Sequence, residues 1–179
     1  MRYLFLCVVL LVGVWGYAQP YKYKSMPARK AVYAEFLGAS VMVGMNYDSR
    51  FYENSRWGYR IGVAHTITNF EEFGVCDGYN YSIYGFNVPL EVNYLVGRRE
   101  TKNKLDLGVG LNLGCYEKND KYLLGYFTFL NIGYRFQPKN GIIFRVGLSP
   151  KLAFGGSSSV LRYVWPTSIF PYLSFGYAF

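Results

Sequence analysis

Residues 105–115 alternate strictly between apolar side chains and small or polar ones, in the order L-D-L-G-V-G-L-N-L-G-C. A side-chain period of two indicates a β-strand with one apolar face. The other face carries glycines, an asparagine and one acid, where a sheet in water would usually carry longer polar side chains. Small residues on that face suit the narrow interior of a closed barrel. The segment therefore predicts a barrel whose apolar face points outward.

Composition favours the same class of protein. Aromatic residues make up 20% of the 179-residue chain and charged residues only 17%, whereas an average soluble domain has roughly 25% charged residues. The chain also contains 20 glycines but no low-complexity tract. This combination argues against disorder and favours an all-β protein that faces lipid.

Eight segments have the pattern of strands, and most of them reach the ~9–11 residues that a tilted membrane-spanning strand needs. The predicted strands are residues 31–37, 41–51, 57–66, 84–96, 104–116, 122–136, 142–154 and 171–179. We therefore predict an all-β fold, an eight-stranded antiparallel up-and-down transmembrane β-barrel over residues 31–179.

Residues 1–18 have the pattern of a secretory signal peptide. Arg2 provides the positive start, residues 3–15 form an apolar run, and Gly16 and Ala18 place small residues at the cleavage site. The run is shorter than the about 20 apolar residues of a membrane helix. We expect cleavage after Ala18, a basic leader over residues 19–30, and location of the mature barrel in the cell outer membrane.

The connections between the predicted strands are of two kinds. Short polar connections are expected at residues 53–56, 97–103 and 137–141, and the last contains Asn140-Gly141, a strong hairpin signal. The other connections are the long segments 67–83 and 155–170 and the tighter segments 38–40 and 118–121. Outer-membrane barrels have short periplasmic turns and longer external loops. We therefore expect both ends of the mature chain to lie in the periplasm.

Extending the alternation to every strand gives an outward set of side chains. Aliphatic residues occupy its middle, and aromatic residues gather toward the predicted periplasmic ends, as in the girdle at a boundary between lipid and water. The predicted girdle residues are Tyr47, Phe51, Tyr59, Tyr94, Tyr134, Phe136, Tyr177 and Phe179.

The inward set contains four acidic residues and four arginines of one parity. They are Glu35, Asp48, Arg50, Arg60, Glu91, Asp106, Arg135 and Arg145. Because an unpaired buried charge costs several kcal/mol, equal numbers suit a closed interior. An eight-stranded barrel is just wide enough for its side chains to fill. We predict a salt-bridged plug without an open pore; the alternative is that some of these residues lie in water at the rims.

The outer half of the predicted interior differs in character. Its inward residues are Met42, Gly44, Gly110, Gly114, Phe127, Phe129, Tyr172 and Ser174. Glycines leave room that aromatic side chains could line, which suggests a small apolar pocket open to the outside. In the other interpretation Phe127 and Phe129 fill that room, because protein interiors pack densely.

The sequence has no recognisable catalytic or metal-binding pattern. Its single histidine, His65, has outward parity near the end of a strand, and the serines lie in no nucleophile motif. Cys76 and Cys115 are predicted on the same side of the barrel, and a disulfide between them stays open because it needs a Cα separation below about 7 Å. We expect no enzymatic activity, no cofactor and no metal ion.

The formal net charge of +8 is distributed unevenly. Nucleic-acid binding is excluded for a secreted barrel without a reader motif. Basic residues gather on the predicted periplasmic side, where they could contact anionic headgroups or an acidic partner, or could simply be solvated. These residues are Lys22, Lys24, Arg29, Lys30, Arg56, Arg98, Arg99, Lys102, Lys104 and Lys139.

Four segments carry a resemblance to a known family. They are residues 46–51 (N-Y-D-S-R-F), 86–94 (F-N-V-P-L-E-V-N-Y), 133–138 (G-Y-R-F-Q-P) and 175–179 (F-G-Y-A-F). The chain resembles the small outer-membrane β-barrels related to the OmpA transmembrane domain and the opacity-type barrels. Its ending, with Phe175, Tyr177 and Phe179, resembles that family's assembly signal. The resemblance implies insertion by the outer-membrane assembly machinery and supplies no catalytic residues.

These observations favour a small integral outer-membrane barrel with a closed interior, which acts as a structural or interaction protein through its external loops. The expected partners are outer-membrane lipid, the assembly machinery and an unidentified protein or ligand at the loops. Two alternatives stay open. A transport or ligand-binding barrel would use the outer pocket, and a soluble lipocalin-like periplasmic barrel would turn its apolar face inward.

Overall fold

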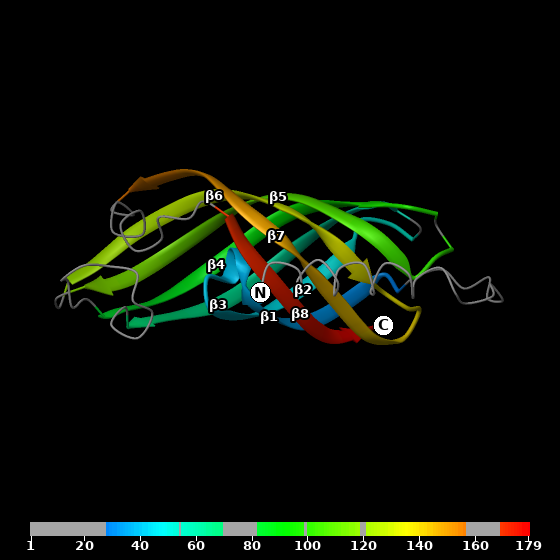
Figure 1. Cartoon of the computed structure of the whole chain (residues 1–179), viewed down its shortest axis with the longest axis horizontal. Coiled ribbons are helices and arrows are strands. Elements are labelled where there is room, and N and C mark those ends of the chain that lie inside the picture. The colour runs from blue at the N-terminus through cyan, green and yellow to red at the C-terminus, as the bar shows by residue number, and fades with distance from the viewer. Residues whose placement is uncertain (1–27, 54, 70–81, 99, 119–120, 157–168) are drawn as a thin grey trace, which may run out of the picture.

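In the computed structural model, the chain forms a closed barrel of antiparallel strands in up-and-down order (Figure 1). The structure describes residues 28–53, 55–69, 82–98, 100–118, 121–156 and 169–179. Eight strands lie in these ranges: β1 (Lys30–Leu37), β2 (Val43–Arg50), β3 (Trp57–Asn69), β4 (Ser82–Val96), β5 (Asn103–Lys118), β6 (Lys121–Phe136), β7 (Gly141–Gly156) and β8 (Ile169–Ala178). Because β8 pairs with β1, the ring is closed. The predicted all-β architecture and strand number are confirmed.

The two faces of the wall differ as the alternation predicted. On β5, Leu105, Val109 and Leu113 are between 44% and 53% exposed, whereas Asp106 and Asn112 are fully buried. The apolar face therefore lies outside the barrel and the polar face inside, which is the reverse of a lipocalin-like arrangement.

The two ends of the barrel differ in their connections. Residues 51–56, 97–102 and 137–140 join strands at one end, here called the turn end, and residues 70–81 and 157–168 at the other, here called the loop end. At the turn end, Gly97 and Gly141 have φ values of 139° and 123°, which glycine adopts at little cost. The hairpin predicted from Asn140-Gly141 is therefore confirmed.

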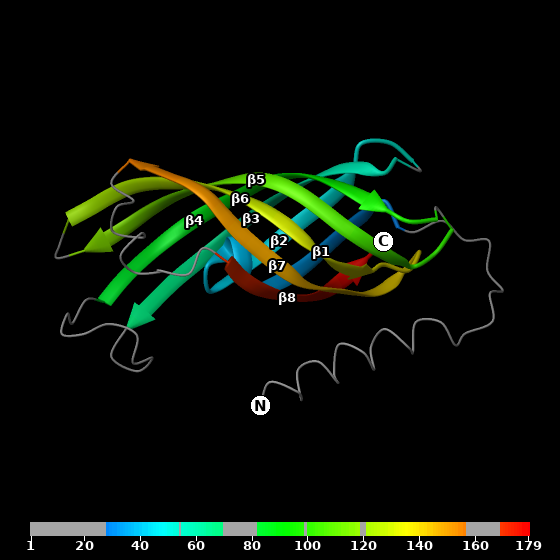
Figure 2. The ribbon, with the colours of Figure 1, turned by 45° about the horizontal axis from the view of Figure 1, so that its top comes forward.

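The strands on one side of the barrel are shorter at the loop end. Strands β1 and β2 have 8 residues each and β8 has 10, whereas β3 has 13 and β5, β6 and β7 have 16. In Figure 2, β3 to β7 continue past the loop-end limits of β8, β1 and β2. Most of the longer strands extend beyond their predicted limits because pairing continues, for example between Asn69 and Ser82 and between Lys118 and Lys121.

The connection between β1 and β2, residues 38–42, folds into the barrel and is here called the inward turn. Gly38–Ser40 form a 3-10 helix, η1, whose three residues are buried, and Val41 is fully buried beside it. The predicted strand over residues 41–51 was therefore too long at its start, because Val41 and Met42 belong to the turn. Small side chains allow this segment to enter the lumen.

Polar contacts hold the inward turn in place. Asn112 Nδ2 donates a hydrogen bond to the carbonyl oxygen of Ala39, and Ser40 Oγ donates to Glu35 at 3.1 Å. Leu37 and Val41 have φ values of 62° and 67°, a region that is unfavourable for such side chains. The turn thus combines backbone strain with buried packing. None of the helices in the described residues is long and apolar enough to cross a membrane.

Candidate functional site

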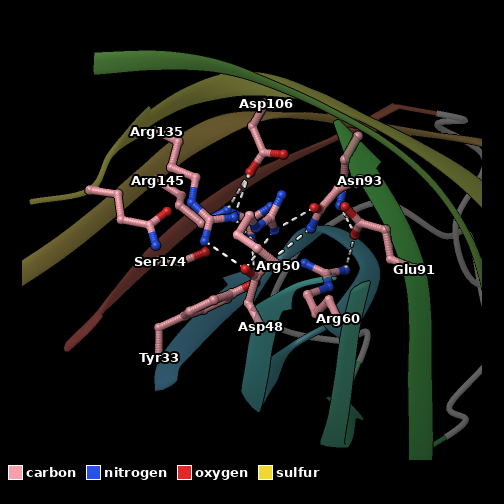
Figure 3. A network of polar contacts seen from close by, with 12 residues as sticks. Tyr33, Asp48, Arg50, Arg60, Glu91, Asn93, Asp106, Arg135, Arg145 and Ser174 are labelled. Carbon is pink, nitrogen blue, oxygen red and sulfur yellow. Dashed lines mark hydrogen bonds and ion pairs between the residues drawn. The ribbon is translucent and has the colours of Figure 1, made fainter. Parts of the chain in front are cut away.

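A chain of ion pairs occupies the turn-end half of the lumen. All eight charged side chains predicted to face inward belong to this chain, with Glu35 and Glu91 at mid-depth opposite Gly44 and Gly110, and none is more than 5% exposed. Seven ion pairs among the described residues join them in one sequence in which acids and arginines alternate (Figure 3). That sequence is Glu91, Arg60, Glu35, Arg145, Asp106, Arg135, Asp48 and Arg50.

Three arginines each join two acids. Arg60 binds Glu35 at 2.6 Å and Glu91 at 2.9 Å. Arg145 binds Asp106 at 3.0 Å and Glu35 at 3.3 Å. Because each of these bridging arginines binds two buried carboxylates, removal of one arginine should lower the free energy of unfolding strongly.

The third bridging arginine, Arg135, makes the most complete contact. Its two terminal nitrogens donate to the two oxygens of Asp48 at 2.7 and 2.9 Å, and one of them also lies 3.4 Å from Asp106. This two-bond geometry is the one in which a guanidinium holds a carboxylate most strongly. Asn93 Nδ2 donates a further bond to Asp48 at 2.8 Å.

Neutral side chains complete the network. Arg145 donates to the Tyr33 hydroxyl at 2.6 Å, and its guanidinium lies 4.9 Å from the Tyr33 ring and 5.2 Å from the Tyr172 ring. Ser174 on β8 donates to Glu35 at 3.3 Å. Since β1 to β7 supply the charges, all eight strands contribute to one network that crosses this half of the lumen.

Glycines on the inner face make room for these large side chains. A Cβ atom on Gly108 would overlap the Glu91 carboxylate, and one on Gly58 would overlap the Arg50 guanidinium. The glycines that marked the inner face of residues 105–115 therefore have a specific role: they allow charged groups to cross the lumen.

The loop-end half of the lumen is filled by rings and by the inward turn. Phe127 and Phe129 are fully buried, with ring centroids 6.2 Å apart. A Cβ on Gly110 would overlap Phe129, and one on Gly114 would overlap Tyr116. The predicted pocket residues Met42, Gly44 and Tyr172 belong to the same region. Met42 is the partly exposed residue of the inward turn, Gly44 faces Ser40 and Ala64, and Tyr172 is buried. Side chains thus occupy the space beside these glycines.

Lys151 is a buried lumen residue that the sequence analysis missed. Its Nζ lies 4.3 Å from the ring centroid of Phe127 and 3.9 Å from that of Phe170, and the residue is 6% exposed. The signal was present in the sequence, because Lys151 shares the parity of Arg145 on the same strand.

Aromatic side chains surround the outside of the turn end. Trp57 and Tyr94 have ring centroids 4.9 Å apart, and Phe144 and Phe175 have centroids 5.0 Å apart. The predicted assembly-signal residues Phe175, Tyr177 and Phe179 are exposed on this outer face. The Tyr94 hydroxyl accepts a hydrogen bond from Arg56 at 3.2 Å, so the aromatic residues lie directly beside the turns.

The remaining candidate residues do not form a site among the described residues. The His65 ring packs against Phe86 on the outer face, with centroids 4.6 Å apart. Cys115 is exposed and has no disulfide partner in the described part of the chain, and Cys76, like the predicted signal peptide and residues 19–27 of the leader, lies outside it. Over the same part, no group of three or more histidine, cysteine or acidic residues could hold a metal ion.

Comparisons of the chain with protein-family models, with curated proteins and with solved structures found no match.

Proposed function

We propose that this protein is an integral outer-membrane barrel with a closed lumen, which serves as a structural or interaction protein through the connections at its loop end. The observation that carries the proposal is the difference between the two faces of the barrel wall. Apolar side chains are exposed all around the outer face, whereas paired charges are buried on the inner face. In water, this arrangement would leave a continuous apolar surface exposed, which monomeric soluble proteins avoid.

The height of the apolar surface supports this proposal. On β4, the exposed Tyr84 lies ten residue steps from Tyr94, and the outward residues between them are apolar. At about 3.3 Å per residue and a tilt of about 40°, this stretch spans about 25 Å, the height of the apolar band of outer-membrane barrels.

The inward turn is also consistent with a lipid environment. β2 begins at Val43, only four residues from the girdle residue Tyr47, so the turn that precedes it would lie about 10 Å above the girdle, within the bilayer. Backbone polar groups in lipid must find partners within the protein. The turn meets this requirement: Leu37 N donates to Met42 O at 2.7 Å, and Val41 N donates to Gly38 O at 3.2 Å.

The membrane assignment is tested by gel mobility in SDS, with and without boiling, of the protein in the outer-membrane fraction. A folded barrel resists SDS at room temperature, so we expect a faster band that shifts to the position of the unfolded chain on boiling. Recovery of the protein in the detergent-free periplasmic fraction, without a shift, would overturn the proposal.

The closed lumen is tested by recording currents after the purified barrel is inserted into planar bilayers. The network of paired charges and buried rings leads us to expect no conductance steps above the background. Reproducible steps would overturn the closed-lumen part of the proposal and favour a transport role, even if the gel experiment had established membrane insertion.

A further inference from the structure

The turn end of the barrel carries exposed basic side chains at each of its connections. Arg56 precedes β3, Arg98 and Lys102 lie between β4 and β5, Lys139 lies between β6 and β7, and Lys30 begins β1 beside the end of β8. We call these five residues the basic rim. They lie around the whole circumference, which distinguishes them from a patch on one side.

Charge at the opposite end has the other sign. Residues 70–81 contain three acidic residues and no lysine or arginine, and residues 157–168 contain one arginine and no acid. At the turn end, the exposed acids among the described residues are Glu53 and Glu100. The barrel therefore has a positive turn end, and its excess charge lies beside the aromatic girdle.

The basic rim and the girdle are in direct contact. Arg56 donates to the Tyr94 hydroxyl at 3.2 Å, and the next residue, Trp57, packs its ring against Tyr94. Girdle residues lie at the boundary between hydrocarbon and headgroups. In a membrane-spanning barrel, side chains one residue beyond the girdle lie at the depth of the headgroups.

We propose that the basic rim binds the headgroups of anionic phospholipids in the leaflet at the turn end and selects them over zwitterionic lipids. This inference rests on the proposed membrane insertion. Headgroups reach a barrel from every side, which matches a rim around the whole circumference, whereas an acidic protein would contact one side. Each basic side chain near an anionic surface favours binding about fivefold.

Trp57 provides a reporter beside the rim. The chain has three tryptophans, Trp15, Trp57 and Trp165, so the W15F/W165F variant retains only Trp57, whether or not residues 1–18 are removed. This variant would be purified from membranes and placed in vesicles that contain brominated phosphatidylglycerol or brominated phosphatidylcholine. Bromine quenches the fluorescence of a tryptophan that it touches, so the ratio of the two quenching curves measures lipid selection at Trp57.

We expect brominated phosphatidylglycerol to quench Trp57 at a severalfold lower mole fraction than brominated phosphatidylcholine. This preference should weaken at high salt, because screening shortens the Debye length from about 10 Å at 0.1 M to about 3 Å at 1 M. The triple variant R98Q/K102Q/K139Q should lose most of it. The matched control, K118Q/K121Q/R162Q, removes the same net charge near the loop end and should keep it.

The outcomes separate this inference from the proposed function. Equal quenching by both lipids would show that the barrel is in the bilayer but does not select headgroups, which overturns this inference and favours an acidic soluble partner for the rim. Quenching by neither lipid would overturn membrane insertion and the inference with it. A preference that survives R98Q/K102Q/K139Q would overturn the proposal that the whole rim selects headgroups, because Lys30 and Arg56 alone would then be sufficient.

Discussion

The two halves of the lumen are filled by different means. In the turn-end half, eight charged side chains form a chain in which each bridging arginine holds two acids. In the loop-end half, Phe127, Phe129 and the inward turn fill the space by shape. The first half depends on electrostatic complementarity and the second on volume.

This difference predicts how each half fails. Removal of a bridging arginine from the turn-end half leaves a buried carboxylate without compensation, which is costly. A volume change in the loop-end half can be absorbed if a neighbouring side chain is altered to match. The two halves can be compared through the free energy of unfolding in urea, measured in vesicles of fixed composition.

The largest effect is expected for Arg60→Ala. Glu91 would lose the arginine that binds it at 2.9 Å, and Glu35 would lose the contact at 2.6 Å. Orphaning a buried charge typically costs about 3–5 kcal/mol. The control Arg50→Ala removes the end of the chain, where Asp48 keeps both bonds from Arg135, and should cost about 1.5 kcal/mol.

The acid partner of Arg60 allows a second substitution at the same ion pair. Adding Glu91→Gln to Arg60→Ala removes the orphaned charge and should restore part of the lost stability. If Arg60→Ala left the unfolding midpoint unchanged, Arg60 would lie in water and the charged half would not be a closed network.

The sequence was sufficient to predict which side chains enter the lumen, because parity along a strand depends only on the local period of two. It could not predict which acid meets which arginine. Arg60 and Glu91 are register partners on neighbouring strands, whereas Arg145 and Glu35 come from strands separated by β8. Such contacts depend on how the closed barrel brings its walls together.

The inward turn escaped prediction for a related reason. A connection of Gly38, Ala39 and Ser40 looks like a tight external turn, and its burial depends on the room inside the finished barrel. The small size of all three residues was the available signal. The parity of Lys151 on β7 also indicates the lumen, but this residue lies toward the loop end of the strand and outside the balanced set of four acids and four arginines.

In the loop-end half, Gly110→Ala is the corresponding change. The added Cβ would overlap the buried Phe129 ring and the carbonyl oxygen of Leu90. Overpacking of this kind costs typically about 2 kcal/mol. The double variant G110A/F129L makes room on the ring side and should be more stable than G110A alone. If F129L gave no relief, the ring would not be what fills the space beside Gly110.

A smaller effect compares two tyrosines that flank the same guanidinium. Tyr33→Phe removes a hydroxyl that accepts a bond from Arg145 at 2.6 Å, and should cost about 1.5 kcal/mol. Tyr172→Phe removes a buried hydroxyl that has no hydrogen-bond partner among the described residues, and should be neutral or slightly stabilising. Equal losses for both would mean that the two halves do not differ in how they satisfy polar groups.

The smallest effect tests the strain in the inward turn. Leu37 has φ 62° and ψ −148°, a conformation that is essentially restricted to glycine. Leu37→Gly and Leu37→Ala both remove the side chain, but only glycine relieves the strain, so the Gly variant should be the more stable by about 1 kcal/mol. In an ordinary strand the order is reversed, because glycine costs roughly 0.5–1 kcal/mol relative to alanine. An Ala variant at least as stable as the Gly variant would mean that residues 37–42 do not fold into the lumen as described. Other residues would then have to fill the loop-end half of the lumen.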